Sequence, residues 1–457
     1  MAGPRRVPND QLRVLLAEAD WTGHAFARQV NVLGAEAGLA LRYQRASVTQ
    51  WISGMRPRPP VPELAAEALS RRLGRLVTVR ETGLDTQNTS PSMLAQQPWW
   101  SDDLAERLRE LRASTGTHRQ DRAGGVYSAA ALTLPAWDDL VSWMSTGKLV
   151  HGEQRARIGR PELSSAKSMV ALFSDADLVF GGGQLRTALA AYLDSTIAPW
   201  LRAATSPGVR RELLITAARL CYLCGFMCFD DELHGAAQRY YLSSLRLSAE
   251  AGEPGGYAVT LRALSVQARL LGHVRQAVHL AEAAVESASA RVPAKTSAFL
   301  FGQLAVAHAA AGSRHDATTS LRTAEAHLAH DDGSARPVGA YHRSALDHQH
   351  AAVSACLGQR RGAIAALHHS IQHRPASERR SRAITLARLA ELQLADGHLE
   401  QACGTWSLFL DDYPHLRSGR ADTAMATLRA RLRPHQRVGA ARTLLGQATR
   451  LTTARNA

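Results

Sequence analysis

The stretch LSVQARLLGHVRQAVHLA, residues 264–281, decides the fold of this chain. A small residue, Ser265, is followed seven positions later by Gly272, then by Ala277 and by Ala281. Glycine commonly ends a helix, because it takes up the left-handed conformation at a helix C-terminus without strain. The chain can then turn into a second helix. Small residues on the two helices let their backbones approach closely. The spacing therefore predicts a tightly packed helix pair.

The same spacing recurs in five units between about residues 210 and 430. One alanine marks each unit, and successive alanines are 41, 40, 46 and 39 residues apart. The alanines are Ala236, Ala277, Ala317, Ala363 and Ala402. The turn-competent residues five positions before them are Asp231, Gly272, Gly312, Gly358 and Gly397. The small residues twelve positions before them are Cys224, Ser265, Ala305, Ala351 and Ala390. The apolar residues four positions after them are Tyr240, Ala281, Leu321, Leu367 and Trp406.

The last two units close with Pro375 and Pro414, where proline stops a helix. Together these offsets resemble the tetratricopeptide repeat, although the period exceeds the usual length of about 34 residues. The resemblance implies a solenoid of stacked helix pairs. Composition agrees, since hydrophobic residues make up 45% of the chain and aromatic residues only 5%, with Ala and Leu dominating. We expect an all-α protein.

A second pattern lies near the N-terminus, in RASVTQWISGMRPRP, residues 45–59. Val48, Trp51 and Ile52 have the spacing of buried positions on a helix that Gly54 ends. Phe26, Ala27 and Val30 indicate an earlier helix that packs inward, and residues 31–44 are expected to link the two. The pair resembles the helix-turn-helix of the Cro and phage-repressor type, with a link longer than the usual tight turn.

On such a second helix, Arg45, Ala46, Thr49 and Gln50 project from the side opposite the apolar residues. Arg can read guanine, Gln can read adenine, and Ala can contact the thymine methyl group, so these four are candidate base-reading residues. Three flanking arginines are candidate phosphate contacts: Arg42, Arg56 and Arg58. No acidic residue occurs between Glu36 and Glu63, so the segment is uniformly basic.

These patterns divide the chain into four parts. We expect a helix-turn-helix domain in residues 1–84, a polar linker in residues 85–98, a helical connecting region in residues 99–209 and the repeat array in residues 210–457. The net charge of +14 fits a polyanionic partner, but only three lysines occur, so an arginine-rich codon bias explains it as well.

Localisation follows from what the sequence does not contain. The first residues carry charges where an export signal needs an apolar segment, and the most apolar stretch, residues 213–229, includes Arg219 and is too short for a membrane span. Five unevenly spaced cysteines do not form a disulfide framework. We expect a cytoplasmic protein without membrane insertion.

No other constellation predicts chemistry. Cys221, Cys224 and Cys228 share one helix face but lack a second ligand pair, so we interpret them as packing residues and expect no metal site and no cofactor. The glycines of residues 181–183 have no preceding strand and no following Lys-Ser/Thr, so we interpret them as a flexible link between helices. No nucleophile, base and acid stand together, and we expect no enzyme activity.

Arg262 and Arg269 are the candidate effector or partner residues of the array. They share one face of the first helix of their unit, on its expected concave side, where they could meet an acidic group or a C-terminal carboxylate. Solvated surface arginines are the alternative interpretation.

The helix-turn-helix, the linker and the repeats together resemble the actinobacterial regulators that carry tetratricopeptide repeats. VFGGGQ (residues 179–184) and GFMCFDDELHGAAQRYYLSSLRLSAEAG (residues 225–252) resemble the most recognisable stretch of that group. The resemblance implies a promoter-binding homodimer whose array binds a peptide, small molecule or protein effector. Some members of that group are negative regulators of differentiation and antibiotic production, so the resemblance also implies such a role as an option for this chain. The alternative is an interaction scaffold without sequence-specific DNA binding.

Overall fold

The computed structural model describes residues 7–85, 103–113, 125–132, 134, 137–140, 157–183, 185–288, 292–330 and 341–456. Throughout these ranges the regular elements are helices, apart from an isolated bridge between Arg157 and Ala204. The predicted fold class is confirmed: the chain is all-α, with stacked helix pairs after an N-terminal helical bundle. Apart from Asp85, the predicted linker of residues 85–98 lies outside the described ranges.

Four helices build the N-terminal domain: α1 (Asp10–Glu18), α2 (Gly23–Glu36), α3 (Arg45–Ile52) and α4 (Val61–Leu73). The Asn9 side chain caps α1 by accepting the Leu12 backbone N–H at 3.0 Å, and Thr22 caps α2 in the same way. Trp51 of α3 is 3% exposed and packs edge-on against Phe26 of α2. These contacts hold α3 on the body of the domain by one face.

The link between α2 and α3 is shorter than the sequence predicted. The link was expected to begin at Asn31, but α2 continues to Glu36, so only residues 37–44 join the helices. The Asn31 side chain donates to the Tyr43 carbonyl and accepts the Tyr43 N–H, both at 2.8 Å. An asparagine pointing inward from a helix thus fixes the end of the link, and Tyr43 packs its ring against Trp51.

A group of helical elements connects this domain to the array. They are α6 (Leu104–Ala113), η1 (Ala129–Leu132), α8 (Arg160–Phe180), α9 (Leu185–Tyr192), the π-helical segment η2 (Leu193–Ile197) and α10 (Ala198–Arg202). α8 and α9 pack against the first helix of the array, and their apolar side chains join its hydrophobic core.

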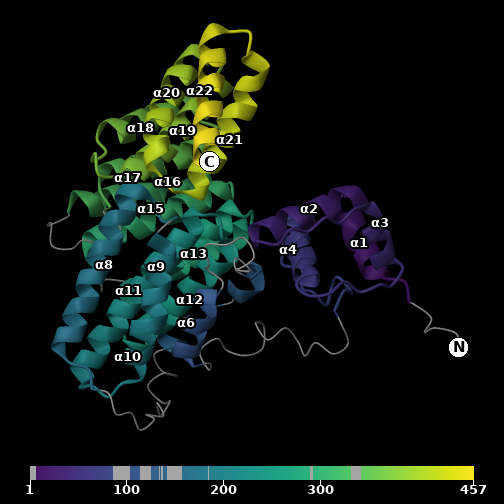
Figure 1. Cartoon of the computed structure of the whole chain (residues 1–457). Helices are drawn as coiled ribbons and strands as arrows, with labels where there is room; N and C mark the ends of the chain where they lie inside the picture. Colours follow the sequence, from purple (N-terminus) through teal and green to yellow (C-terminus); the bar gives the residue numbers. More distant parts are fainter. Residues whose placement is uncertain are drawn as a thin grey trace, which may run out of the picture.

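The array consists of five antiparallel helix pairs followed by two terminal helices (Figure 1). The pairs are α11 (Pro207–Asp230) with α12 (His234–Glu250), α13 (Pro254–Leu270) with α14 (Val274–Ala288), α15 (Ala294–Ala310) with α16 (Arg314–Ala329), α17 (Arg343–Cys356) with α18 (Arg360–Gln372), and α19 (Arg379–Ala395) with α20 (Leu399–Asp412). The chain ends with η3 (Tyr413–His415), α21 (Gly419–Leu432), η4 (Arg433–His435) and α22 (Gly439–Asn456).

The predicted repeat register is confirmed in four units and wrong by one residue in the first. The Ala277 N–H donates to the carbonyl of His273, the residue just before α14. In the first unit the equivalent bond is made by Ala237, not by Ala236. Glu232, with φ of +60°, takes the left-handed turn that Gly272 makes at +90°. Because no glycine marks that turn, the sequence pattern pointed one residue too early, to Asp231.

The corrected register explains Gly225. It occupies the small position that Ser265 holds in the next unit, and a Cβ there would lie 2.8 Å from the Tyr241 ring. Cys224, which the sequence placed at this position, is instead buried one residue away.

α11 is the one helix in the described ranges that is long and apolar enough to cross a membrane. However, 78% of its apolar window is buried inside the protein. Its apolar surface is therefore used in packing against other helices, as expected for a core helix.

Candidate functional site

The face of α3 that was predicted to contact DNA is open in the structure. α3 buries Val48 and Trp51, and all four predicted base-reading residues on its other side are exposed. Those residues are Arg45, Ala46, Thr49 and Gln50. In Figure 1, α3 lies on the side of the N-terminal domain that is remote from the array. The array therefore leaves this face accessible.

The three predicted phosphate contacts, Arg42, Arg56 and Arg58, are exposed as well. Glu36, the acidic residue that precedes this segment, is held on the other side of the domain by Arg71, at 2.9 Å. The segment that carries α3 and its flanking arginines therefore contains no acidic side chain of its own. Such a surface suits a phosphate backbone.

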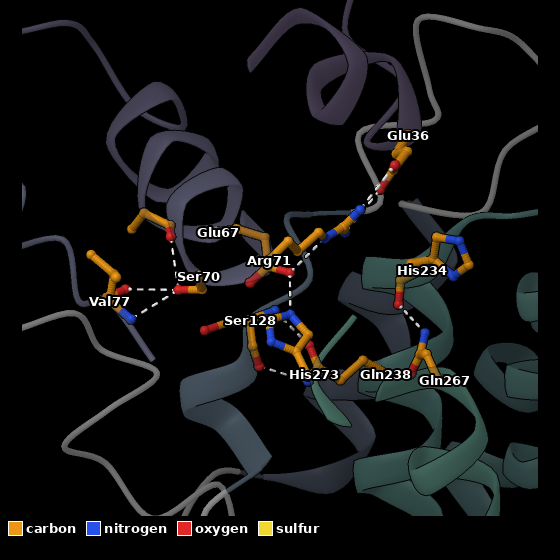
Figure 2. A network of polar contacts seen from close by, with 11 residues as sticks. Glu36, Glu67, Ser70, Arg71, Val77, Ser128, His234, Gln238, Gln267 and His273 are labelled. Carbon is orange, nitrogen blue, oxygen red and sulfur yellow. Dashed lines mark hydrogen bonds and ion pairs between the residues drawn. The ribbon is translucent and has the colours of Figure 1, made fainter. Parts of the chain in front are cut away.

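A buried polar network joins the N-terminal domain to the array (Figure 2). Glu67 of α4 places its Oε1 atom 2.7 Å from Nε2 of His273, at the turn between α13 and α14. The two side chains are 4% and 1% exposed. Arg71 donates to the same Oε1 atom at 2.8 Å and also forms an ion pair with Glu36. We call the contact between Glu67, Arg71 and His273 the latch.

Residues 125–132 complete this junction. The Tyr127 ring stacks on the His273 ring with centroids 5.6 Å apart, and burial raises the pKa of the Tyr127 hydroxyl. Ser128 exchanges two hydrogen bonds with the Gln238 side chain of α12. Nearby, burial and then the positive charge of Arg71 lower the pKa of His234 to about 4. The junction therefore holds α4 through specific polar contacts in a nearly dry environment.

A second buried network joins the start of the array to its end. Arg380 of α19 contacts Asp177 of α8 at 2.6 Å, and Arg420 of α21 contacts Asp230 of α11 at 2.7 Å. Arg380 also lies 3.9 Å from Asp230. Burial tends to raise the pKa of Asp230, but the two guanidinium groups outweigh it and hold that pKa below its ordinary value. We call these four residues the clasp.

The three glycines of residues 181–183 belong to this contact and are not the flexible link that we expected. The Gly183 N–H donates to the Arg417 carbonyl at 3.0 Å, and the Arg417 N–H donates to the Phe180 carbonyl at 2.8 Å. A Cβ on Gly182 would lie 2.6 Å from the Cβ of Met227. Glycine is needed here because two backbones and α11 meet at close range.

The clasp was not predicted from the sequence, although one signal pointed to it. The two stretches that most resemble the regulator family, residues 179–184 and 225–252, meet in space at the clasp. Their distinctive glycines and acidic residues therefore have a structural role in closing the array.

The two candidate effector residues lie inside the array and are only partly accessible. Arg262 places its guanidinium 3.8 Å from the centre of the Phe299 ring, and Arg269 is half-buried two turns further along α13. Both side chains come from the first helix of a pair, as predicted. The interpretation as freely solvated surface arginines is wrong, because the Nε atoms of both are buried.

The three cysteines of α11 are packing residues in the structure. Cys221, Cys224 and Cys228 are buried in α11, and burial raises the pKa of the Cys221 thiol. Within the described ranges no group of three or more His, Cys, Asp or Glu side chains could hold a metal ion.

Comparison with known proteins adds one match to the N-terminal domain. Residues 12–85 match the family model of the SP15 N-terminal domain. The matched segment runs from α1 past the end of α4 and covers less than a fifth of the chain, so it concerns this domain alone. No curated protein matches the chain.

Among solved structures, the chain is similar to a putative kinesin light chain of Podosopora anserina with nearly identical TPR-like repeats. The identity is 20%, and the alignment covers 44% of this chain and 97% of that chain with a TM-score of 0.32. The class of protein is defined by the helix pairs themselves: this is an α-helical repeat protein with an N-terminal helical domain.

Proposed function

We propose that this chain is a cytoplasmic, non-enzymatic transcription regulator in which α3 reads promoter DNA and the array binds an effector. One observation carries the proposal: the basic face of α3 is exposed, and α3 lies on the side of the N-terminal domain that is remote from the array (Figure 1). A buried or covered α3 would instead have favoured a structural role for the N-terminal domain.

The proposed DNA-binding form is a homodimer. One small recognition helix buries too little surface for tight specific binding, so two copies of α3 on a two-fold operator supply the remainder. Sedimentation of the full-length protein with and without a palindromic duplex measures this stoichiometry.

The first prediction concerns specific DNA binding. Full-length protein is expected to bind duplexes from the region upstream of its own gene more tightly than scrambled duplexes of the same composition. Arg45→Ala and Gln50→Ala should each remove about 1–3 kcal/mol of this discrimination, because each deletes a base contact. Arg56→Ala should weaken both duplexes alike and lower the salt slope by about 1. Fluorescence anisotropy at several salt concentrations measures all three effects.

Arg322→Ala is the matched control, since Arg322 is an exposed arginine of α16 in the array. It should change neither affinity nor salt dependence. Equal binding to both duplexes, unaffected by the α3 substitutions, would reject the regulator. The array would then be the functional part, because stacked helical repeats generally offer extended concave surfaces to protein partners.

A further inference from the structure

The clasp joins the two ends of the array. It brings α19 and α21 back to α8 and α11, so the first helices of the pairs face one another. Arg269 of α13 is consequently within electrostatic range of Cys356 on α17 and Arg388 on α19. Helices that are two and three repeats further along the chain thus lie near Arg269 of α13.

Arg262 is an incompletely paired cation inside the array. Its guanidinium lies over the Phe299 ring and has the Tyr222 hydroxyl as a hydrogen-bonding partner, with the hydroxyl groups of Tyr341 and Tyr241 nearby. Its buried Nε atom has no hydrogen-bond partner among the described residues. Burial lowers the Arg262 pKa. The environment therefore penalises its charge without supplying a carboxylate in direct contact.

Arg269 is in the same situation. Its Nε atom is also buried without a partner among the described residues. Burial is the main cause that lowers the pKa of Arg269, and the positive charges of Arg388 and Arg262 lower it further. A guanidinium that is partly desolvated and repelled by its neighbours is destabilising unless an anion accompanies it.

His348 on α17 lies near the same arginines. Its pKa is lowered to about 4, by burial and then by four arginines: Arg374, Arg420, Arg269 and Arg388. Its Nδ1 atom lies 3.2 Å from the Thr385 hydroxyl. His348 is therefore neutral at pH 7 and adds a polar group without adding charge.

A groove of about 450 Å³ lies between α19, α21 and η4. Its walls combine apolar side chains with two arginines, one histidine and one glutamate: Leu392, Leu394, Ala395, Ala430, Pro434, Arg388, Arg431, His435 and Glu391. Arg388 is exposed there and pairs with Glu391 at 3.2 Å. Arg388 therefore borders this groove and also acts electrostatically on Arg269.

We propose that the interior of the array binds an extended ligand with at least two anionic groups, one at Arg262 and one at Arg269. Guanidinium forks bind carboxylate and phosphate oxygens in a bidentate way. Seven residues along a helix correspond to about 10 Å, which sets the spacing of the two anionic groups. This inference concerns the array alone and stands whether or not α3 binds DNA.

The test uses full-length protein with three probes: a hexaglutamate peptide, citrate and inorganic pyrophosphate. Isothermal titration calorimetry and thermal unfolding compare each probe with sodium chloride at the same ionic strength. At least one probe is expected to bind and to raise the unfolding temperature. Arg269→Gln should weaken that binding by at least about tenfold, because one charged hydrogen-bonding partner is removed.

Two further variants complete the design. Arg262→Lys keeps the charge but loses the planar fork, so it should weaken binding less than Arg262→Gln does. Arg322→Gln on α16 is the matched control and should leave binding unchanged. A response to hexaglutamate alone identifies an acidic peptide as the ligand class, and a response to citrate or pyrophosphate alone identifies a small anion. Either result supports the site. If no probe stabilises the wild type more than Arg269→Gln, the proposal is overturned.

Discussion

Arg380→Met is expected to lower the free energy of unfolding by about 3–5 kcal/mol, the usual cost of removing one partner from a buried ion pair. Arg380 is buried and serves Asp177 and Asp230 together. Without it, Asp230 keeps Arg420, but Asp177 loses its cationic partner in a site where burial already raises its pKa. The loss should open the contact between the two ends of the array.

Denaturant titration followed by far-ultraviolet circular dichroism measures this free energy, and hydrogen exchange in α8 and α21 locates the opening. Arg388→Met, on the same helix, is the control because Arg388 pairs with Glu391 while their side chains are 53% and 26% exposed. Its cost should be below about 1 kcal/mol. Adding Asp177→Leu to Arg380→Met removes the unpaired charge and should restore most of the stability. A cost for Arg380→Met no larger than for Arg388→Met would contradict the clasp.

The fold could be predicted from the sequence because its determinants are local. Ser265, Gly272 and Ala277 lie within one helix pair, so their spacing alone indicates how that pair packs. The same logic failed by one residue where Glu232 replaced glycine at a left-handed turn. A turn is set by backbone conformation, which glycine usually but not always marks.

The clasp and the latch could not be predicted because their partners are far apart in sequence. Arg380 is 203 residues from Asp177, and His273 is 206 residues from Glu67. No periodicity connects such pairs, and a buried His or Asp looks like any other in one sequence. The exposure of the α3 face was predictable, since Val48 and Trp51 fix which side is buried. The surroundings of Arg262 come from Tyr222 of α11 and Phe299 of α15, so the lack of a carboxylate partner there could not be predicted.

His273→Ala is expected to release the N-terminal domain from the array at a cost of about 1.5–3 kcal/mol, the contribution of a hydrogen bond to a charged group. Glu67 would remain buried with Arg71 as its partner, so the domain itself should stay folded. The Tyr127 ring would also lose the surface on which it stacks. The backbone N–H of Ser128, which donates to Gln238 across the junction, should then exchange at least about tenfold faster.

Small-angle scattering of the full-length protein should show a larger radius of gyration for this variant. His279→Ala is the matched control, because His279 is exposed on α14. Glu67→Gln keeps an acceptor for His273 and Arg71. Its radius of gyration should therefore lie between those of His279→Ala and His273→Ala. An unchanged radius and unchanged Ser128 exchange in His273→Ala would show that the latch does not hold the domains together.

The latch also makes the two proposals separable. Arg269 is near the end of α13, and His273, four residues later, contacts Glu67 of α4. An anion bound at Arg269 is therefore close to the latch in the chain. If the array regulates DNA binding, a ligand at Arg269 should change DNA affinity in the wild type, and DNA should change ligand affinity by the same factor. His273→Ala should abolish this coupling while both affinities measured singly persist. Coupling that survives in His273→Ala would require another route between the array and α3, such as a change in how two copies of the chain associate.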